Sequence, residues 1–405
     1  MIDRPLPRSL DPLYDETLVG FVLRLACHNG TVPAEIAARM GLTDETSATP
    51  GFVPSWQLAD MDKPSLVRAA RVAQLTVAEA DQLLLAPLGH RYGLVSRRYR
   101  PWTDPQQLSR PDRWIFIRAS QYCPPCLKGD SDLLGQLYGG AWKRAWRLPV
   151  MFACSRHQQL LGRYCPKCRT PGQFSSNGLI TRAGAGELHP TQCRGTASDA
   201  SSGGRRAVCG ANLARAHSPR MPADSDTQGF LLALQQRLDA LLSDDGPQVA
   251  NSCGTSIPVA QYFVDLRVVA TLVMASWPEA IGFAATPALA KAIEREVEQR
   301  RRSRRRAPGG TKRYYGANSS LSPTESSLAM GAVLGIAERI LDGREKQWTE
   351  MAVGPLYRGP LRAGTFPELV RQSGTSSALQ EILGVVPRAE DVQSSDTYDR
   401  SPRNG

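Results

Sequence analysis

The sequence predicts a mainly α-helical protein built around a small α+β metal-binding centre. Seven of the nine cysteines fall between residues 123 and 209, and two pairs have the Cys-x-x-Cys spacing. Amphipathic segments with helix-capping residues lie on both sides of this block. We therefore predict an N-terminal domain with a helix-turn-helix (1–90), a tandem zinc-finger domain (91–213), a C-terminal helical domain (220–385) and a disordered tail (386–405).

Composition places the chain among globular proteins that bind a polyanion. Its 405 residues, 41% hydrophobic and 21% charged, allow two or three domains and include no apolar run of membrane-spanning length. The start resembles neither a signal nor a transit peptide, so we expect a cytoplasmic protein whose paired cysteines bind metal rather than form disulfides. The net charge of +11 favours nucleic acid as the partner, with a membrane surface second and a solvated arginine-rich surface as the alternative.

The N-terminal segment has the pattern of short capped helices. One is expected over 16–28, capped by Asp15, and another over 33–40. Two more, 64–71 and 76–85, are separated by a tight turn, and the second opens with the capping box Thr76-Val77-Ala78-Glu79. This arrangement is a candidate helix-turn-helix, although any pair of packed helices without DNA contact fits the same pattern.

The first predicted zinc site consists of two residue pairs with equal spacing. Cys123 and Cys126 form one pair, and Cys154 and His157 form the other. Each pair can occupy two adjacent corners of a tetrahedron around Zn²⁺.

The second predicted site begins with Cys165 and Cys168. We assign Cys193 and Cys209 as its other two ligands because glycine after Cys209 would let backbone N–H groups turn toward the sulfur. A quartet that uses His189 with Cys193 is the alternative. With Cys193 and Cys209 as ligands, the small, polar segment 195–206 would be a loop between them.

Both predicted Zn²⁺ ions are expected to be structural. Each has four protein donors, whereas a catalytic zinc keeps an open position, and no His-Glu-x-x-His sequence occurs. Each ion should contribute on the order of 10 kcal/mol to folding. Because phosphate-binding loops, triad signatures and acidic sets for a two-metal nuclease are also missing from the sequence, we expect no enzymatic activity. Cys27 and Cys253 are expected to be core thiols.

The remaining elements follow from periodicity. Within the metal block we expect strands at 114–117 and 148–153 and a helix at 131–146. Beyond it, helices are expected at 227–242, 259–275, 287–306, 324–341 and 366–372.

Two basic stretches are candidates for nucleic-acid contact. The segment 90–118 interleaves arginines with aromatic residues, and 300–306 holds six arginines in seven positions. The alternatives are a linker that covers the zinc domain and a solvated arm. The selected residues are Arg97, Arg98, Arg100, Arg301, Arg302, Arg304, Arg305, Arg306, Lys312 and Arg313.

Two segments resemble the TniQ (TnsD-like) family of transposition proteins. Residues 12–26, Pro-Leu-Tyr-Asp-Glu-Thr-Leu-Val-Gly-Phe-Val-Leu-Arg-Leu-Ala, are similar to the family's N-terminal segment, with Thr17 in place of serine. The block of Tyr122-Cys-Pro-Pro-Cys126, two tryptophans, Cys154-Ser-Arg-His157 and Cys165-Pro-Lys-Cys168 resembles the family's tandem zinc fingers. The long insertion before Cys209 departs from a compact second finger.

The resemblance implies a non-catalytic target-selection adaptor in DNA transposition. Such proteins bind DNA, or a DNA-bound targeting complex, and recruit an AAA+ ATPase regulator and then the transposase complex; some members form homodimers. The sequence leaves one alternative, a zinc-containing helix-turn-helix transcription regulator, and a less favoured third, a metal-dependent nuclease.

Overall fold

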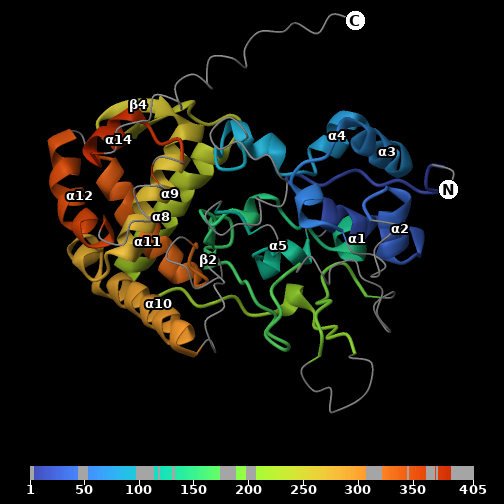
Figure 1. The fold of residues 1–405 in the computed structure, drawn as a ribbon. Helices are drawn as coiled ribbons and strands as arrows, with labels where there is room; N and C mark the ends of the chain where they lie inside the picture. Colours follow the sequence, from blue (N-terminus) through green and yellow to red (C-terminus); the bar gives the residue numbers. More distant parts are fainter. Residues whose placement is uncertain are drawn as a thin grey trace, which may run out of the picture.

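The computed structural model describes residues 4–43, 53–96, 114–116, 119–129, 133–173, 188–197, 207–306, 322–343, 346–361, 370 and 373–384. These residues are mostly helical, and their strands form two small two-stranded sheets. Figure 1 places the N-terminal helices at one end, the C-terminal helices at the other and the cysteine-rich segment between them. The mainly α prediction is therefore confirmed.

The N-terminal end consists of α1 (Leu18–Asn29), α2 (Pro33–Arg39), α3 (Lys63–Ala73) and α4 (Val77–Asp81). Their apolar faces enclose one buried core that includes Phe21, Leu25, Ile36 and Val72. The capping box is present: the Thr76 hydroxyl accepts from the Glu79 N–H, and the Glu79 carboxylate accepts from the Thr76 N–H.

Two expectations for this end need correction. Thr17, not Asp15, caps α1, because Asp15 has a positive φ of 58° and its carboxylate instead accepts from Arg144 Nε at 3.2 Å. The second helix of the hairpin ends at Asp81 rather than near residue 85, since the following leucines enter buried cores. The helix-turn-helix stays a prediction.

The centre holds little regular structure: α5 (Pro124–Lys128), α6 (Leu133–Tyr138), and the antiparallel pair β1 (Ala153–Cys154) and β2 (Gln159–Leu160). The helix predicted over 131–146 is too long. It ends at Tyr138 because Gly139 turns the chain with φ +75°, and a Cβ at Gly140 would collide with the Cys126 carbonyl oxygen. The strand predicted at 148–153 is also wrong, since only β1 is extended and paired. Residues 114–116 form no strand; residue 117 lies outside the described residues.

The C-terminal end contains α8 (Ser225–Leu242), α9 (Val259–Ala275), α10 (Pro287–Arg306) and α11 (Ser327–Leu341), which correspond to four predicted helices. Helix α9 is buried along most of its length and packs against α11 and α12 (Lys346–Leu361). The predictions omitted α12, α14 (Ser377–Ile382) and the hairpin β3 (Val249–Ser252)–β4 (Thr255–Pro258). The helix predicted over 366–372 lies mostly outside the described residues.

The central segment is joined to both ends by packing and hydrogen bonds. Its Phe152 and Leu148 lie in the C-terminal core, together with Tyr92 from the N-terminal half. On the other side, the Thr17 N–H donates to the Trp142 carbonyl at 2.7 Å. The cysteine-rich segment therefore connects the two helical ends.

A buried ion pair lies where α1 meets this segment. Arg24 Nη1 is 2.6 Å from a Glu16 carboxylate oxygen, and the side chains are 3% and 0% exposed. The Leu13 N–H also donates to Glu16. Burial raises the pKa of Glu16 to about 7, although Arg24 and these hydrogen bonds oppose the shift.

Glu16 should give the folded protein a measurable pH dependence. Its folded pKa of about 7 exceeds the ordinary 4.5, so the native state holds a proton that the unfolded chain has lost. The contribution of protonated Glu16 to the free energy of unfolding is fully present below pH 4.5 and is lost as the pH rises through 7. Between pH 5 and 8, the free energy of unfolding of wild type relative to Glu16→Gln should fall by about 2.5 kcal/mol.

Denaturant titrations at both pH values would measure this difference. Glu79→Gln is the control, because hydrogen bonds from Thr76 lower the pKa of Glu79 and give the opposite sign. An equal pH dependence in wild type and Glu16→Gln would contradict the prediction.

Candidate metal centres

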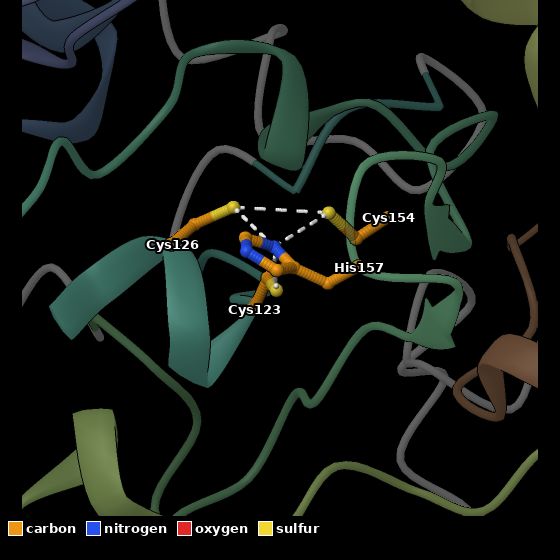
Figure 2. A group of neighbouring side chains, drawn as sticks. All are labelled: Cys123, Cys126, Cys154 and His157. Carbon is orange, nitrogen blue, oxygen red and sulfur yellow. Dashed lines mark hydrogen bonds between the residues drawn. The ribbon is translucent and has the colours of Figure 1, made fainter. Parts of the chain in front are cut away.

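The first centre brings together four side chains from two tight backbone turns. Cys123 is the N-cap of α5, so Cys126 falls in the first turn of the same helix. Cys154 ends β1, and His157 lies in the turn before β2, which Gln158 closes with a φ of +49°. Figure 2 shows the three sulfur atoms and the imidazole ring converging on one point.

The distances in this centre suit a four-coordinate ion. His157 Nδ1 lies 3.4, 3.2 and 3.4 Å from the sulfurs of Cys123, Cys126 and Cys154, and the Cys126 and Cys154 sulfurs are 3.7 Å apart. All four donor atoms lie within 4.8 Å of one another. A tetrahedral zinc site has S···S edges of about 3.8 Å and S···N edges of about 3.6 Å, so the arrangement matches that geometry closely.

Electrostatics also favours a cation at this point. Hydrogen bonds from Cys123 and Cys126 lower the pKa of Cys154, whereas hydrogen bonds to its two neighbours and burial raise the pKa of Cys126. Three thiols this close cannot all ionise beside one another unless a positive ion neutralises them. Gln159 Nε2 donates to the Cys123 sulfur at 3.0 Å, a contact that stabilises a thiolate.

Helix α8 holds the second turn of this centre in place. The Gln235 side-chain oxygen accepts from the backbone N–H groups of Phe152 and Ala153, both at 2.9 Å. Asp239 accepts from the Ser155 hydroxyl at 2.6 Å and from Gln235 at 2.8 Å. The backbone that presents Cys154 is thus fixed by two polar side chains of the C-terminal end.

The second centre consists of Cys165, Cys168, Cys193 and Cys209, whose sulfurs also lie within 4.8 Å of one another. The sulfurs of Cys165 and Cys209 are 3.7 Å apart, and those of Cys168 and Cys193 are 3.5 Å apart. Burial opposes ionisation of Cys168, but hydrogen bonds from the Thr170 hydroxyl and N–H lower its pKa to about 7. A ready thiolate among four sulfurs is a donor set that suits a soft divalent ion.

A narrow hairpin explains how two cysteines distant in sequence reach one centre. The backbone N–H groups of Cys193 and Cys209 donate to the carbonyls of Ala211 and Gly195, both at 2.8 Å. The ladder continues to the Ala197 N–H, which donates to the Ala207 carbonyl at 2.9 Å. Cys193 is thus opposite Ala211 and Cys209 is opposite Gly195, so the two cysteines lie at diagonal positions on neighbouring segments of the hairpin.

The glycine after Cys209 has the expected role, and a second glycine acts at Cys193. Gly210 has a φ of +65°, and the next N–H, that of Ala211, donates to the Cys209 sulfur, while the Gly210 N–H donates to the Cys193 carbonyl. Gly195 provides the N–H that points to the Cys193 sulfur, at 3.4 Å. A Cβ at Gly195 would lie 2.9 Å from the Cys168 sulfur, so this position has no room for a side chain.

The geometry groups Cys193 with Cys209 and leaves His189 outside the quartet. His189 Nδ1 lies 2.8 Å from the Thr191 hydroxyl, and Nε2 lies 3.1 Å from the Leu137 carbonyl oxygen. Both ring nitrogens are therefore engaged elsewhere. The two centres share a single buried cluster that includes Tyr122, Trp142, Trp146 and Leu161.

The proposed nucleic-acid residues are only partly described. Arg301 and Arg302 are exposed near the C-terminal end of α10, and Arg302 pairs with Glu298 at 2.8 Å. The backbone of 304–306 continues α10, but the side chains of Arg304, Arg305 and Arg306 lie outside the description, as do Arg97, Arg98, Arg100, Lys312 and Arg313 altogether.

Sequence reasoning did not foresee that this arginine run begins inside the fold. Arg300 is buried, donates to Glu296 at 3.0 Å and to the Ser322 and Pro323 carbonyls at 3.1 and 2.8 Å. Its i−4 glutamate is the signal that could have indicated an internal partner. The first arginine of the segment 300–306 is therefore fixed within the folded protein.

None of the helices in the described part of the chain combines the length and apolarity that a bilayer crossing needs.

These features define a helical protein with two Cys/His clusters that could each hold a metal ion. Comparison with known families gives one match: residues 7–161 match the TniQ family. Neither the curated proteins nor the solved structures provide a match to the chain. The matched segment contains the N-terminal helices and the whole first centre, and it ends before Cys165. The resemblance seen in the sequence is thus confirmed for residues 7–161, which match a family associated with transposition; the match does not extend to the second centre.

Gly195→Ala should disrupt the second centre while leaving the first intact. The added methyl group would meet the Cys168 sulfur and the Thr170 side chain, so the four sulfurs could not converge. Titration with Co²⁺, followed by thiolate-to-metal absorbance, should show one bound ion where wild type binds two.

Gly210→Ala is the matched control, since its methyl group would meet only Leu188, at 3.7 Å. It should cost about 1 kcal/mol of backbone strain but keep both ions. Two bound ions in Gly195→Ala would contradict the prediction, because they would show that Thr170 and Cys168 move enough to accommodate the methyl group.

Proposed function

We propose that this protein is a non-catalytic target-selection adaptor in DNA transposition. It binds DNA, or a DNA-bound targeting complex, and recruits an AAA+ ATPase regulator and then the transposase complex. The observation that carries the proposal is the TniQ match over residues 7–161, which includes every donor of the first centre. The family resemblance also supports a homodimer, and the paired cysteines, which we expect to bind metal in a reducing compartment, support a cytoplasmic location.

The ions we assign to the two centres are structural Zn²⁺. A Cys₃His set and a Cys₄ set are donors that zinc prefers over harder ions. Four protein donors complete a tetrahedral shell, and such a shell offers a substrate no coordination position. The bound ions then crosslink distant parts of the central segment and stabilise it between the helical ends.

Reconstitution with purified components would test the adaptor role. The ATPase regulator and transposase encoded beside this chain, together with a donor element, should give insertions at defined target positions only when this protein is present. Random insertions at an unchanged frequency without the protein would contradict target selection.

The alternative is a zinc-containing transcription regulator that uses α3 and α4 as a helix-turn-helix. The capped α4 that follows α3 after a short turn supports it. A regulator needs no ATPase partner, so a pull-down with the neighbouring ATPase separates the two functions. Binding favours the adaptor, and promoter occupancy without ATPase binding favours the regulator.

Cys126→Ser should release one zinc ion and unfold the central segment. The change leaves three donors in the first centre, and most of the about 10 kcal/mol that a structural zinc supplies would be lost. Elemental analysis should give about one zinc per chain, with increased protease cleavage near α5. Cys27→Ser alters a thiol that lies outside both clusters and is exposed, not in the core as the sequence suggested. This variant should keep two ions and resist cleavage like wild type.

The exposed arginines of α10 should contribute to DNA affinity through phosphate contacts. Substitution of both Arg301 and Arg302 by glutamine should weaken duplex binding and reduce the slope of log affinity against log salt by roughly 2. Lys291→Gln with Arg295→Gln removes the same charge from the first half of the same helix and is the control. Equal effects of the two pairs in anisotropy titrations would show that only net charge matters.

A further inference from the structure

Helix α6 presents three leucines to solvent. Leu133, Leu134 and Leu137 are 69%, 45% and 49% exposed. They occupy positions i, i+1 and i+4 of one helix, so they lie together on its outer face. The inner face is already filled, because Gly135 is buried and the Tyr138 hydroxyl lies 2.7 Å from His28 Nδ1 of α1. Single exposed leucines are ordinary, but three on one short helix form an apolar patch.

The structure holds this helix firmly against the first metal centre. The Gly140 N–H donates to the Leu127 carbonyl of α5 at 2.9 Å. A Cβ at Gly129 would lie 2.9 Å from the Gly135 Cα, so glycine at this position allows the two short helices to touch. Figure 1 shows α5 in the middle of the molecule, between the two helical ends. The leucines are therefore displayed on a fixed support.

Hollows on both sides of α6 are lined by cations. One, of about 300 Å³, is bounded by Leu134, Lys143, Arg156, the first-centre ligands Cys126 and His157, and Arg24, which contacts Glu16. The other, of about 500 Å³, is bounded by Gly135, Gln136, Lys128 and Arg215. Among the described residues that line them there is no aspartate or glutamate.

We propose that this surface is the docking site for an acidic amphipathic segment of a partner protein. The α6 surface consists of Leu133, Leu134, Leu137, Lys128, Lys143 and Arg215. Apolar side chains of the segment cover the leucines, and its carboxylates reach the cations of the two hollows. A nucleic acid would satisfy the cations, but its phosphates give the leucines nothing to pack against, so the leucines favour a protein. The inference rests on the adaptor role proposed above for its biological meaning.

Selection from a random peptide library displayed on phage tests the chemistry of the occupant. The bait is the full-length zinc-loaded protein, and the comparison bait carries Leu134→Glu and Leu137→Glu. Peptides enriched on wild type alone should combine Asp or Glu with apolar residues three or four apart. Enrichment of basic peptides, enrichment that is equal on both baits, or no enrichment would overturn the proposal.

The best selected peptide, synthesised with a fluorophore, then maps the surface by anisotropy. Leu134→Glu with Leu137→Glu, and separately Lys128→Glu with Arg215→Glu, should each weaken binding at least tenfold. Met351→Glu, which adds the same charge at a side chain 70% exposed on α12, should leave binding unchanged. Zinc content and circular dichroism equal to wild type show that each variant is folded.

A duplex DNA arm separates this inference from the adaptor role. The leucine variant should bind DNA as wild type does. If it loses DNA affinity while no peptide binds, the α6 surface is a nucleic-acid interface and the present inference is wrong. If peptides bind as expected but the reconstituted insertion reaction is unaffected by the protein, the adaptor role fails and the docking surface stands.

Discussion

The convergence of Cys123, Cys126, Cys154 and His157 is the constraint on which the structure depends. The segment that carries them has short helices and two-residue strands, and such elements have little stability of their own. Its three thiol groups lie within 4.8 Å of one another and of the imidazole, so their ionised forms repel one another unless a bound cation neutralises them. Metal binding can supply the free energy that this irregular segment lacks, which explains how it connects two helical ends without a sheet or a long helix.

Polar contacts on both sides fix the position of the segment that carries the first metal centre. On the C-terminal side, Gln235 and Asp239 of α8 accept from the backbone and hydroxyl groups around Cys154. On the N-terminal side, Asp15 accepts from Arg144 and from the Ala145 N–H. These groups are largely buried, and a buried polar group without its partner is costly. The relative placement of the helical ends is therefore coupled to the geometry of the first centre, and a surface such as that of α6 is presented in a defined orientation.

The sequence allowed most of the C-terminal helices and both cysteine quartets to be predicted. Local pattern explains this success, because α10 follows the apolar period of a helix, α9 is a long apolar segment, and the cysteine pairs have short fixed offsets. Residue spacing predicted the wrong conformation where tertiary contacts determine it. Gly139 and Gly140 end α6 because α5 approaches them, and Asp15 leaves its capping position because Arg144 binds it. Hairpin β3–β4 was missed because its turn, Cys253-Gly254, adopts positive φ in a cysteine.

The sequence by itself determined the donor residues, the helical class and the family resemblance, since donor chemistry and periodicity are local properties of the chain. Only the tertiary structure decided between His189 and the Cys193–Cys209 pair. A hairpin ladder places those two cysteines at diagonal positions on neighbouring segments, whereas His189 contacts the Thr191 hydroxyl and the Leu137 carbonyl. The tertiary structure also decided the role of Arg300, whose side chain is buried in an ion pair with Glu296 and is not exposed like Arg301 and Arg302. Both choices depend on groups distant in sequence that folding alone brings within hydrogen-bonding range.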